Sequence, residues 1–439
     1  METKGLLKIE KRPMPCWLIL CIVALPLFWG VIFGLLSLPA AVKYVADVAC
    51  VTLLLFMFLQ RSLRFEKRIL PLAFLVIAFF LYCLISYLFN YQSVIYFLWG
   101  MRNNFRFYVF FLATAIFFRE RDAEKFFAFL DVLFWINVPV TLVQYFALGF
   151  KQDYLGGIFG TEVGANGFTI IFFSIVLGRS ILKYMSMQES TSLCFSKCAV
   201  ALLIAALAEL KFFFVFFLAI MLLSAFLTAF SWRKVLIFAL GAAMLFFTST
   251  LLMLLFEEFE GFMSLENIWE VATKESYSSD QTVNRLSSVR VLRGIFSMDA
   301  KTVTFGMGLG NCDTSAFPIC NTPFYKIYGF LRYTYFSIAF LFLEVGIVGI
   351  LLYLSFFIMC FVLISRRIKS GICNKTHGQT ALITSVLAMV LMVYNASLRA
   401  EIGYLVYFVL ALPFIRKGDA DGYDPEEHAL IDPDDALPN

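Results

Sequence analysis

The sequence predicts an all-α integral membrane protein of about twelve transmembrane helices with one large extracytoplasmic loop. Of its 439 residues, 61% are hydrophobic and only 15% are charged, whereas a soluble domain carries roughly 25% charged residues. Apolar runs of roughly 20 residues, the length that crosses a bilayer as a helix, recur along the whole chain. Lys and Arg gather on alternate connections between these runs.

The apolar runs divide the chain into candidate spans. The first, from Cys16 to Leu38, is long enough to cross a bilayer and is interpreted as a retained helix, not a signal peptide. Residues 195–230 could form one tilted helix, but Glu209 and Lys211 interrupt them, so two spans are predicted. The candidate spans are 16–38, 40–59, 70–89, 92–118, 126–148, 165–182, 195–208, 212–230, 235–256, 337–363, 380–395 and 402–415.

Loop charge predicts the orientation. With two spans over 195–230, every basic connection falls on one side, which the positive-inside rule makes cytoplasmic. Both termini are then cytoplasmic. The basic residues concerned are Lys4, Lys8, Lys11, Arg12, Arg61, Arg64, Lys67, Arg68, Arg119, Arg121, Lys125, Arg233, Lys234, Arg366, Arg367, Lys369, Lys375, Arg416 and Lys417. The outer connections are then those near Pro39, Asn90, 149–164, Glu209–Lys211 and 396–401.

Four regions follow from this topology. Residues 1–256 form a first bundle of about nine helices, residues 257–336 a large extracytoplasmic loop, and residues 337–415 the last three helices. The tail 416–439 is acidic, contains Pro and is poor in large apolar residues. It is therefore predicted to be disordered in the cytoplasm and to aid solubility, with a regulatory contact as the alternative.

Ionisable residues at membrane depth are the first candidates for a functional site, because each costs at least ~2.5 kcal/mol to insert. All the sets found here fall on the predicted outer side, which is the reverse of unaided positive-inside sorting. Arg102 and Arg106 lie one helical turn apart and share a helix face. The four sets are Arg102 with Arg106, Glu209 with Lys211, Arg399 with Glu401, and Arg285 with Arg290 and Arg293.

The arginines of the long loop follow a helical pattern. In RLSSVRVLRGIFSMDAKTVTFGMGLGN, Arg285, Arg290 and Arg293 fall within an arc of about 140° at 100° per residue. Apolar side chains occupy the other side, which predicts an amphipathic helix at the membrane surface. Converging cations indicate an anion, and the Arg fork suits phosphate oxygens, so a lipid-linked diphosphate is expected. The alternative is pairing with headgroups or with Glu257, Glu258 and Glu260.

Several other kinds of site are disfavoured. The glycines of FGMGLGN lack the strand–turn–helix setting of a nucleotide site, so a tight turn is predicted. His377 and His428 both fall on the cytoplasmic side, which excludes a His-dependent outer active site. No metal-ligand pattern appears, and neither a cofactor nor nucleic acid is expected. Cys312 and Cys320 form either a disulfide or two free thiols.

Three stretches resemble the bacterial O-antigen polymerase and ligase family of membrane glycosyltransferases. GGIFGTEVGANGFTI (156–170) is similar to that family's G-x-F-G…N-x-F-A motif. The arginine and glycine stretch 285–311 is similar to its R-L…W-x-x-A…F-G-x-G-x-G loop. FSIAFLFLEVGIVGILLYL (336–354) resembles its H-N-x-x-L-x-x-L-x-E-x-G-x-x-G-L motif. The span count and the single large outer loop also match, so the resemblance covers most of the chain.

The resemblance implies a GT-C-like fold in the bacterial inner membrane and a metal-independent, inverting glycosyl transfer. It implies a donor glycan on undecaprenyl diphosphate, a lipid-linked repeat unit as acceptor, and a chain-length regulator and a flippase as partners. The product would be a surface polysaccharide such as lipopolysaccharide O-antigen or capsule. The family's ligases have an outer His where this chain has Phe336 and Ser337, which favours a polymerase over a ligase.

The resemblance also suggests roles for individual residues. Lys211 corresponds to the family's hinge cation, and Arg290 to its loop arginine, with Arg285 as the alternative register. Glu209 and Glu162 are the outer candidates for the base that inverting attack needs. Glu344 is interpreted as making a helix contact. The rival function is a transporter or lipid flippase, but the loop QRSLRFEKRI lacks the Gly-Asp-Arg pattern of the major facilitator family.

Overall fold

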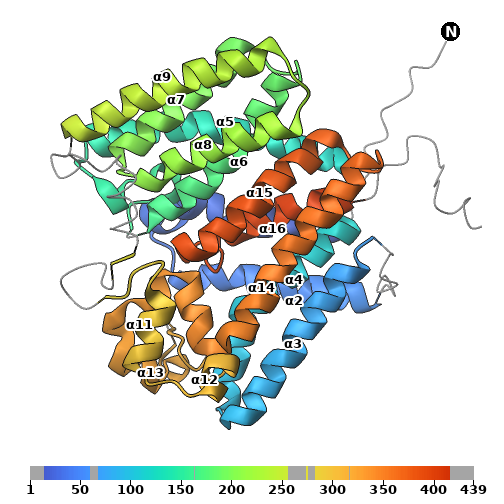
Figure 1. Cartoon of the computed structure of the whole chain (residues 1–439), viewed down its shortest axis with the longest axis vertical. Helices are drawn as coiled ribbons and strands as arrows, with labels where there is room; N and C mark the ends of the chain where they lie inside the picture. The colour runs from blue at the N-terminus through green and yellow to red at the C-terminus, as the bar shows by residue number, and fades with distance from the viewer. Residues whose placement is uncertain are drawn as a thin grey trace, which may run out of the picture.

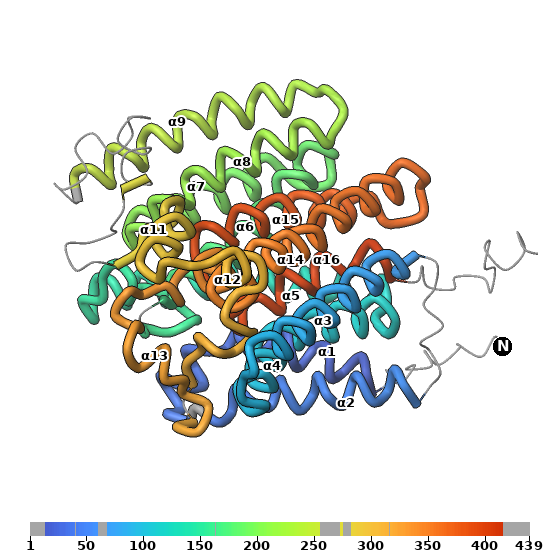
Figure 2. The backbone as a smooth tube through the Cα atoms, turned by 60° about the horizontal axis from the view of Figure 1, so that its bottom comes forward, coloured from blue at the N-terminus to red at the C-terminus, as the bar shows by residue number. Residues whose placement is uncertain are grey.

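The computed structural model confirms the all-α class. It describes residues 14–59, 68–162, 164–255, 273–274, 282–315 and 317–415. Within these ranges the regular elements are helices, and no β-strand occurs (Figure 1). Figure 2 shows the same helices from a second direction, with α11, α12 and α13 gathered at one end of the molecule. These three are Ser288–Ile295, Ala300–Phe305 and Pro323–Tyr328.

Each of the twelve predicted apolar segments coincides with helix. Several helices extend past the apolar run, because hydropathy marks the part suited to lipid and not the helix end. The bounds are α1 Met14–Ala24, continued by helical turns Leu25–Phe28 and Gly30–Leu35, α2 Val45–Leu59, α3 Leu70–Asn90, α4 Val94–Phe117, α5 Glu120–Phe146, α6 Ala165–Met185, α7 Thr191–Leu207, α8 Lys211–Leu227, α9 Trp232–Leu255, α14 Ser337–Lys369, α15 Lys375–Tyr394 and α16 Gly403–Ala411.

The chain is a membrane protein by the length and composition of its helices. Seven of the described helices are long and apolar enough to cross a bilayer, namely those over 41–59, 70–90, 120–146, 165–185, 232–254, 337–369 and 375–394. Four shorter apolar helices, over 14–28, 191–207, 211–227 and 403–414, accompany them. α4 is 24 residues long but carries Arg102 and Arg106 in its middle. The count of twelve crossings stays a prediction.

The break predicted inside residues 195–230 is present. α7 ends at Leu207 and α8 begins at Lys211, and the two helices pack against each other. Glu209 turns the chain with a φ of +56°. The amide of Leu210 donates to the carbonyl of Ala205 at 2.8 Å, which closes the helix end. A charged pair in an apolar run therefore marks a hairpin here.

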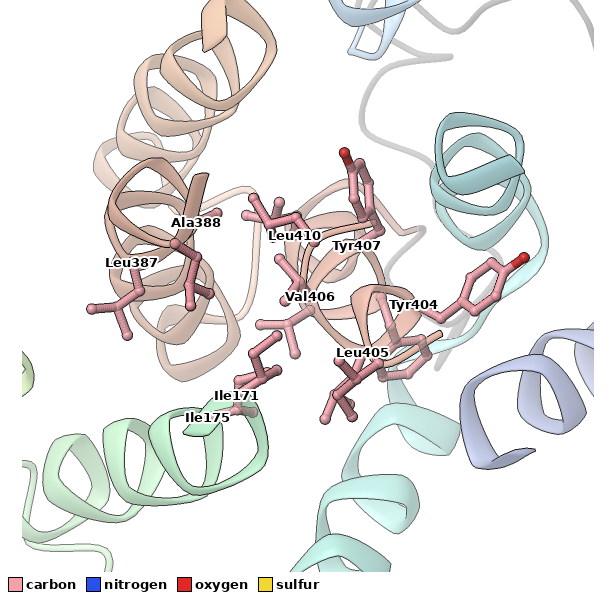
Figure 3. Close-up of a cluster of buried hydrophobic side chains, with 14 of the residues drawn as sticks. Ile171, Ile175, Leu387, Ala388, Tyr404, Leu405, Val406, Tyr407 and Leu410 are labelled. Atoms are coloured by element: carbon pink, nitrogen blue, oxygen red, sulfur yellow. The ribbon is translucent and has the colours of Figure 1, made fainter. Parts of the chain in front are cut away.

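The core lies where α6, α15 and α16 meet. Figure 3 shows Ile171 and Ile175 of α6 close to Val406 and Leu405 of α16, with Ala388 of α15 alongside. Every residue of α16 is buried, and α6 is the most enclosed of the seven candidate spans. Because lipid tails are as apolar as Leu, such helices are held by close packing more than by a hydrophobic driving force.

The glycine stretch of the loop clasps two helices. Gly306, Gly308 and Gly310 have φ values of +71°, +100° and +84°. Between them, the amide of Met307 donates to the carbonyl of Leu343 at 2.7 Å. A Cβ built on Gly310 would lie 2.0 Å from the carbonyl oxygen of Tyr96, so only glycine fits there. The predicted tight turn is thus confirmed; we call residues 306–310 the glycine clasp.

The helix connections separate into two ends of the molecule. At one, which we call the loop end, the Asn90 amide donates to the Gly306 carbonyl at 3.3 Å and Phe212 stacks on Tyr394 at 4.1 Å. At the other, the opposite end, Asn374 donates to Glu120 at 2.8 Å. Predicted outer connections lie at the loop end, and the described basic ones at the opposite end.

Outside the described residues lie the basic positions 4–12, 61–67 and 416–417, the tail 416–439, and 257–272 and 275–281 of the loop.

Candidate functional site

Charged and amide side chains from five segments meet at the loop end. They come from α2, α4, the stretch that follows the glycine clasp, α14 and the connection between α15 and α16. Each touches the next, so they form one continuous group, which we call the loop-end network. Its members are Asp47, Arg102, Asn103, Arg106, Asp313, Glu344, Arg399 and Glu401.

Asp47 joins the two arginines of α4. The Nε of Arg102 donates to Asp47 Oδ2 at 3.0 Å, and its Nη2 contacts the same oxygen. The Nη1 of Arg106 donates to Asp47 Oδ1 at 3.2 Å. Arg106 also reaches Glu401 Oε1 at 3.5 Å and the carbonyl of Arg399 at 3.2 Å. One buried guanidinium thus ties α2 and α4 to the start of α16.

Arg399 occupies the other half of the network. Its guanidinium lies over the ring of Phe340 at 3.4 Å from the centroid. Its Nη2 is 3.7 Å from Glu344 Oε2 and 3.9 Å from Asp313 Oδ2. Glu344 accepts the amide N–H of Gly310 at 2.9 Å, so the glycine clasp ends on this carboxylate. Glu344 was predicted to make a helix contact; its partners are instead the glycine clasp and Arg399 in the connection between α15 and α16.

Asp313 links the two halves. Its Oδ2 accepts from the Asn103 amide at 2.5 Å, and Asn103 in turn contacts Arg102. Burial raises the pKa of the Asp313 carboxyl, while the nearby Arg399 and the Asn103 hydrogen bond act in the opposite direction. The fold holds this carboxyl in place although its environment disfavours the charge.

The network sets three arginines against four carboxylates. Arg102, Arg106 and Arg399 are three cations that the sequence assigned to diphosphate binding, and the structure brings them together. Each also contacts a carboxylate within the network. Sequence reasoning missed Asp47 and Asp313 as those partners. Asp47 carried a usable signal, since a carboxylate inside the apolar segment 40–59 is as costly as the arginines.

A second group of predicted residues surrounds Tyr394. The Nε of Arg285 donates to the Tyr394 carbonyl at 3.2 Å, and its guanidinium lies 4.9 Å from the centre of the Tyr394 ring. Phe212 stacks on the same ring. The neighbouring Lys211 forms a 3.0 Å ion pair with Glu209. The loop arginine and the hinge of α7 and α8 therefore meet at the end of α15.

The remaining predicted residues lie apart from these groups. Arg290 and Arg293 are exposed on α11, while Leu292 between them is fully buried, so the helix is amphipathic as predicted. Arg285 precedes α11 instead of belonging to it. Glu162 is exposed in the turn before α6. Its side chain enters neither the network nor the Tyr394 group among the contacts described.

The loop end also holds a small cavity of about 250 Å³. Tyr96, Asn311, Cys312 and Phe324 are among the residues that line it. Cys312 and Cys320 are free thiols, and burial raises the pKa of Cys312 well above its usual range. Within the described ranges, no three His, Cys, Asp or Glu side chains are grouped so as to hold a metal ion.

A further charged group went unnoticed in the sequence. At the opposite end, Arg179 donates to Glu124 Oε2 at 2.5 Å, and His377 Nε2 lies 2.9 Å from Glu124 Oε1. Lys197 lies 2.8 Å from Asp131. Positive-inside sorting already accounts for basic residues at that end, so nothing in the sequence predicted that they would pair with carboxylates.

A scan against protein-family models matches no family, and a search of curated proteins finds no similar sequence. The resemblance therefore rests on its three motifs alone, and the site is judged by its own geometry.

Proposed function

We propose that the chain is a polysaccharide polymerase with a twelve-span, GT-C-like fold. It joins undecaprenyl-diphosphate-linked oligosaccharide repeat units into a surface polysaccharide by inverting glycosyl transfer. The observation that supports this is that Arg285 contacts Tyr394 and that Phe212, the residue after Lys211, stacks on the same ring. The family resemblance gives Lys211 as the hinge cation and Arg290 as the loop arginine, with Arg285 as the alternative register; these contacts favour the Arg285 register.

The chemistry needs a cation and a base on the same side. Breaking the bond between sugar and diphosphate leaves negative charge on the phosphate oxygens, which fixed cations stabilise. Lys211 and Arg285 supply them, and the exposed Arg290 extends the cationic surface. Glu209 accepts the proton of the attacking hydroxyl. When Glu209 takes up the proton, its carboxylate becomes neutral and no longer pairs with the Lys211 ammonium. The leaving phosphate gains negative charge at the same time, so Lys211 exchanges its ion pair with Glu209 for a contact with the phosphate.

The loop-end network has a positioning role in this proposal. Its arginines are neutralised by carboxylates, so they hold the ends of α2, α4, α14 and α16 in register instead of gripping the diphosphate. The enzyme resides in the bacterial inner membrane with both termini cytoplasmic. Its partners are the lipid-linked glycans, a chain-length regulator and the flippase that delivers repeat units.

The test is polymerisation of purified lipid-linked repeat units in vitro, without added metal. Lys211→Ala and Arg285→Ala each remove a charge-assisted contact worth roughly 1.5–3 kcal/mol, so each should slow the rate roughly ten- to a hundredfold. Lys211→Arg should be milder than Lys211→Ala. Arg290→Ala tests the alternative in which Arg290, and not Arg285, corresponds to the loop arginine of the family. Lys326→Ala removes an exposed loop-end cation on α13 and serves as the control.

The outcomes separate the alternatives. Wild-type rates in Lys211→Ala, Arg285→Ala and Arg290→Ala alike would eliminate the diphosphate site. In a deletion strain, a polymerase leaves single repeats on the surface and lipid-linked units outside the membrane. Full-length glycan that is not attached to its anchor would indicate a ligase, and lipid-linked units trapped on the cytoplasmic side would indicate a flippase.

A further inference from the structure

An open cleft lies at the opposite end of the molecule, away from the loop end. It is a cleft of about 480 Å³ at the opposite end, between the start of α5, the end of α6 and the start of α15. Polar and charged side chains line it, among them Glu120, Glu124, Lys183, Asn374 and Lys375. The cleft lies at helix ends, where a polar lining can receive a polar or charged ligand.

Both carboxylates of this cleft already have partners. Glu120 accepts from the Asn374 amide at 2.8 Å. Glu124 contacts Arg179 and His377, and the Arg179 guanidinium lies over the ring of Phe127 at 3.9 Å from its centroid. These contacts fix the walls of the cleft; Arg179 compensates the charge of Glu124, whereas the partner of Glu120 is a neutral amide.

The lysines of the cleft differ from the carboxylates. Lys183 is half-buried and Lys375 is exposed. Neither ammonium group has a hydrogen bond or an ion pair with any residue in the described ranges. Nearby, the buried Arg179 leaves its Nε and Nη1 without a hydrogen-bond partner. Counting Arg179 behind the wall, three cations stand against the two carboxylates Glu120 and Glu124, in a space large enough to admit a ligand.

We propose that this cleft binds the phosphate group of an anionic ligand between Lys183 and Lys375. Two cations facing a polar cavity are compensated best by an anion with several acceptor oxygens, which a phosphate supplies. The ligand is either the headgroup of an anionic lipid or a soluble phosphate compound, since both present the same group. The site is separate from the proposed glycosyl-transfer site and does not depend on it.

The experiment uses the full chain in two arms. In the first, equilibrium dialysis measures binding of radiolabelled inorganic phosphate at constant ionic strength, with chloride as the replacement salt. In the second, native mass spectrometry counts phosphatidylglycerol molecules retained after extraction from bilayers of known composition. The variants are Lys183→Gln and Lys375→Gln. Lys369→Gln is the matched control, because Lys369 is an exposed cation at the same end that does not line the cleft.

Each cleft variant should weaken binding roughly ten- to a hundredfold, the effect of losing one charge-assisted contact, while the control should bind as the wild type does. Binding of free phosphate identifies a soluble ligand, and retention of lipid alone identifies a headgroup. No binding in either arm, or an equal loss in Lys369→Gln, would overturn the proposal. Lys375→Gln alters an exposed side chain, so it keeps the test valid if Lys183→Gln fails to fold.

Discussion

Two buried arginines, Arg399 at the loop end and Arg179 at the opposite end, have carboxylate partners that differ in their exposure to water. At the loop end, Arg399 faces Glu344, and neither side chain is more than 11% exposed. At the opposite end, Arg179 is 4% exposed, but its partner Glu124 is 46% exposed. Both side chains of the Arg399–Glu344 pair are shielded from water, whereas the carboxylate of the Arg179–Glu124 pair is in contact with it. The same ion-pair chemistry therefore has different consequences at the two ends.

The difference concerns what is left when a cation is removed. A carboxylate that already contacts water keeps most of its hydration, whereas a buried one is left uncompensated. The loop-end network is therefore expected to be rigid and intolerant of substitution, as a positioning device should be. The Arg179–Glu124 pair is expected to tolerate a change in charge better, because its carboxylate is 46% exposed; the Lys197–Glu189 pair at the same end, with side chains 2% and 7% exposed, does not share this property.

Arg399→Leu should have the largest effect on stability. It leaves Glu344 and Asp313 without their shared cation, and breaking a buried pair in this way costs about 3–5 kcal/mol. The free energy of unfolding in mixed micelles measures it. The double variant Arg399→Leu/Glu344→Gln should recover part of the loss, because an amide oxygen still accepts from Gly310. A loss below about 1 kcal/mol would show that the two ends do not differ.

Arg179→Leu should cost less, about 1–2 kcal/mol, by the same measurement. Glu124 retains His377 and water after the substitution, and the principal loss is the contact of the guanidinium with Phe127. Equal losses in Arg179→Leu and Arg399→Leu would contradict the comparison. Correct membrane insertion of both variants is the necessary control.

The smallest expected effect is a pH trend, on the order of 1 kcal/mol. Burial raises the pKa of Asp313, so its protonated form favours the folded state. That contribution is present below the unfolded pKa of about 3.9 and is lost as pH rises through the folded value. The Asn side chain of Asp313→Asn does not titrate. The melting temperature of this variant should therefore rise relative to that of the wild type as the pH increases from about 4.

Asp299 supplies the control with the opposite sign. It caps α12 by accepting the amide N–H of Thr302 at 2.9 Å, and the hydrogen bonds from Thr302 lower the pKa of Asp299. Its contribution is present above the unfolded pKa and is lost as pH falls through the folded value. The melting temperature of Asp299→Asn should therefore rise relative to that of the wild type as the pH falls. If the melting temperatures of Asp313→Asn and Asp299→Asn changed with pH in the same direction, burial of Asp313 could not be the cause of the pH dependence.

The sequence predicted the helices well and the site only in part. Apolar runs located twelve helical segments because lipid-facing and buried positions are equally apolar. The break between Glu209 and Lys211 was predicted for the same reason, since charge interrupts such a run. The sequence could locate cations such as Arg399 but not their partners. Pairing with Asp313 or Asp47 depends on how distant segments meet, and hydropathy carries no information about that.

The span of the loop-end network along the chain has a consequence during translation. Glu401 lies 295 positions after Arg106, so at 5–20 residues per second it emerges from the ribosome roughly 15–60 s later. Asp47 precedes Arg106 by 59 positions and is already synthesised when the arginine appears. Asp47 is therefore the first carboxylate of the network with which the arginines of a newly synthesised α4 can pair. The nascent chain has to keep its arginines neutralised by this early aspartate until the last helices are made and complete the network.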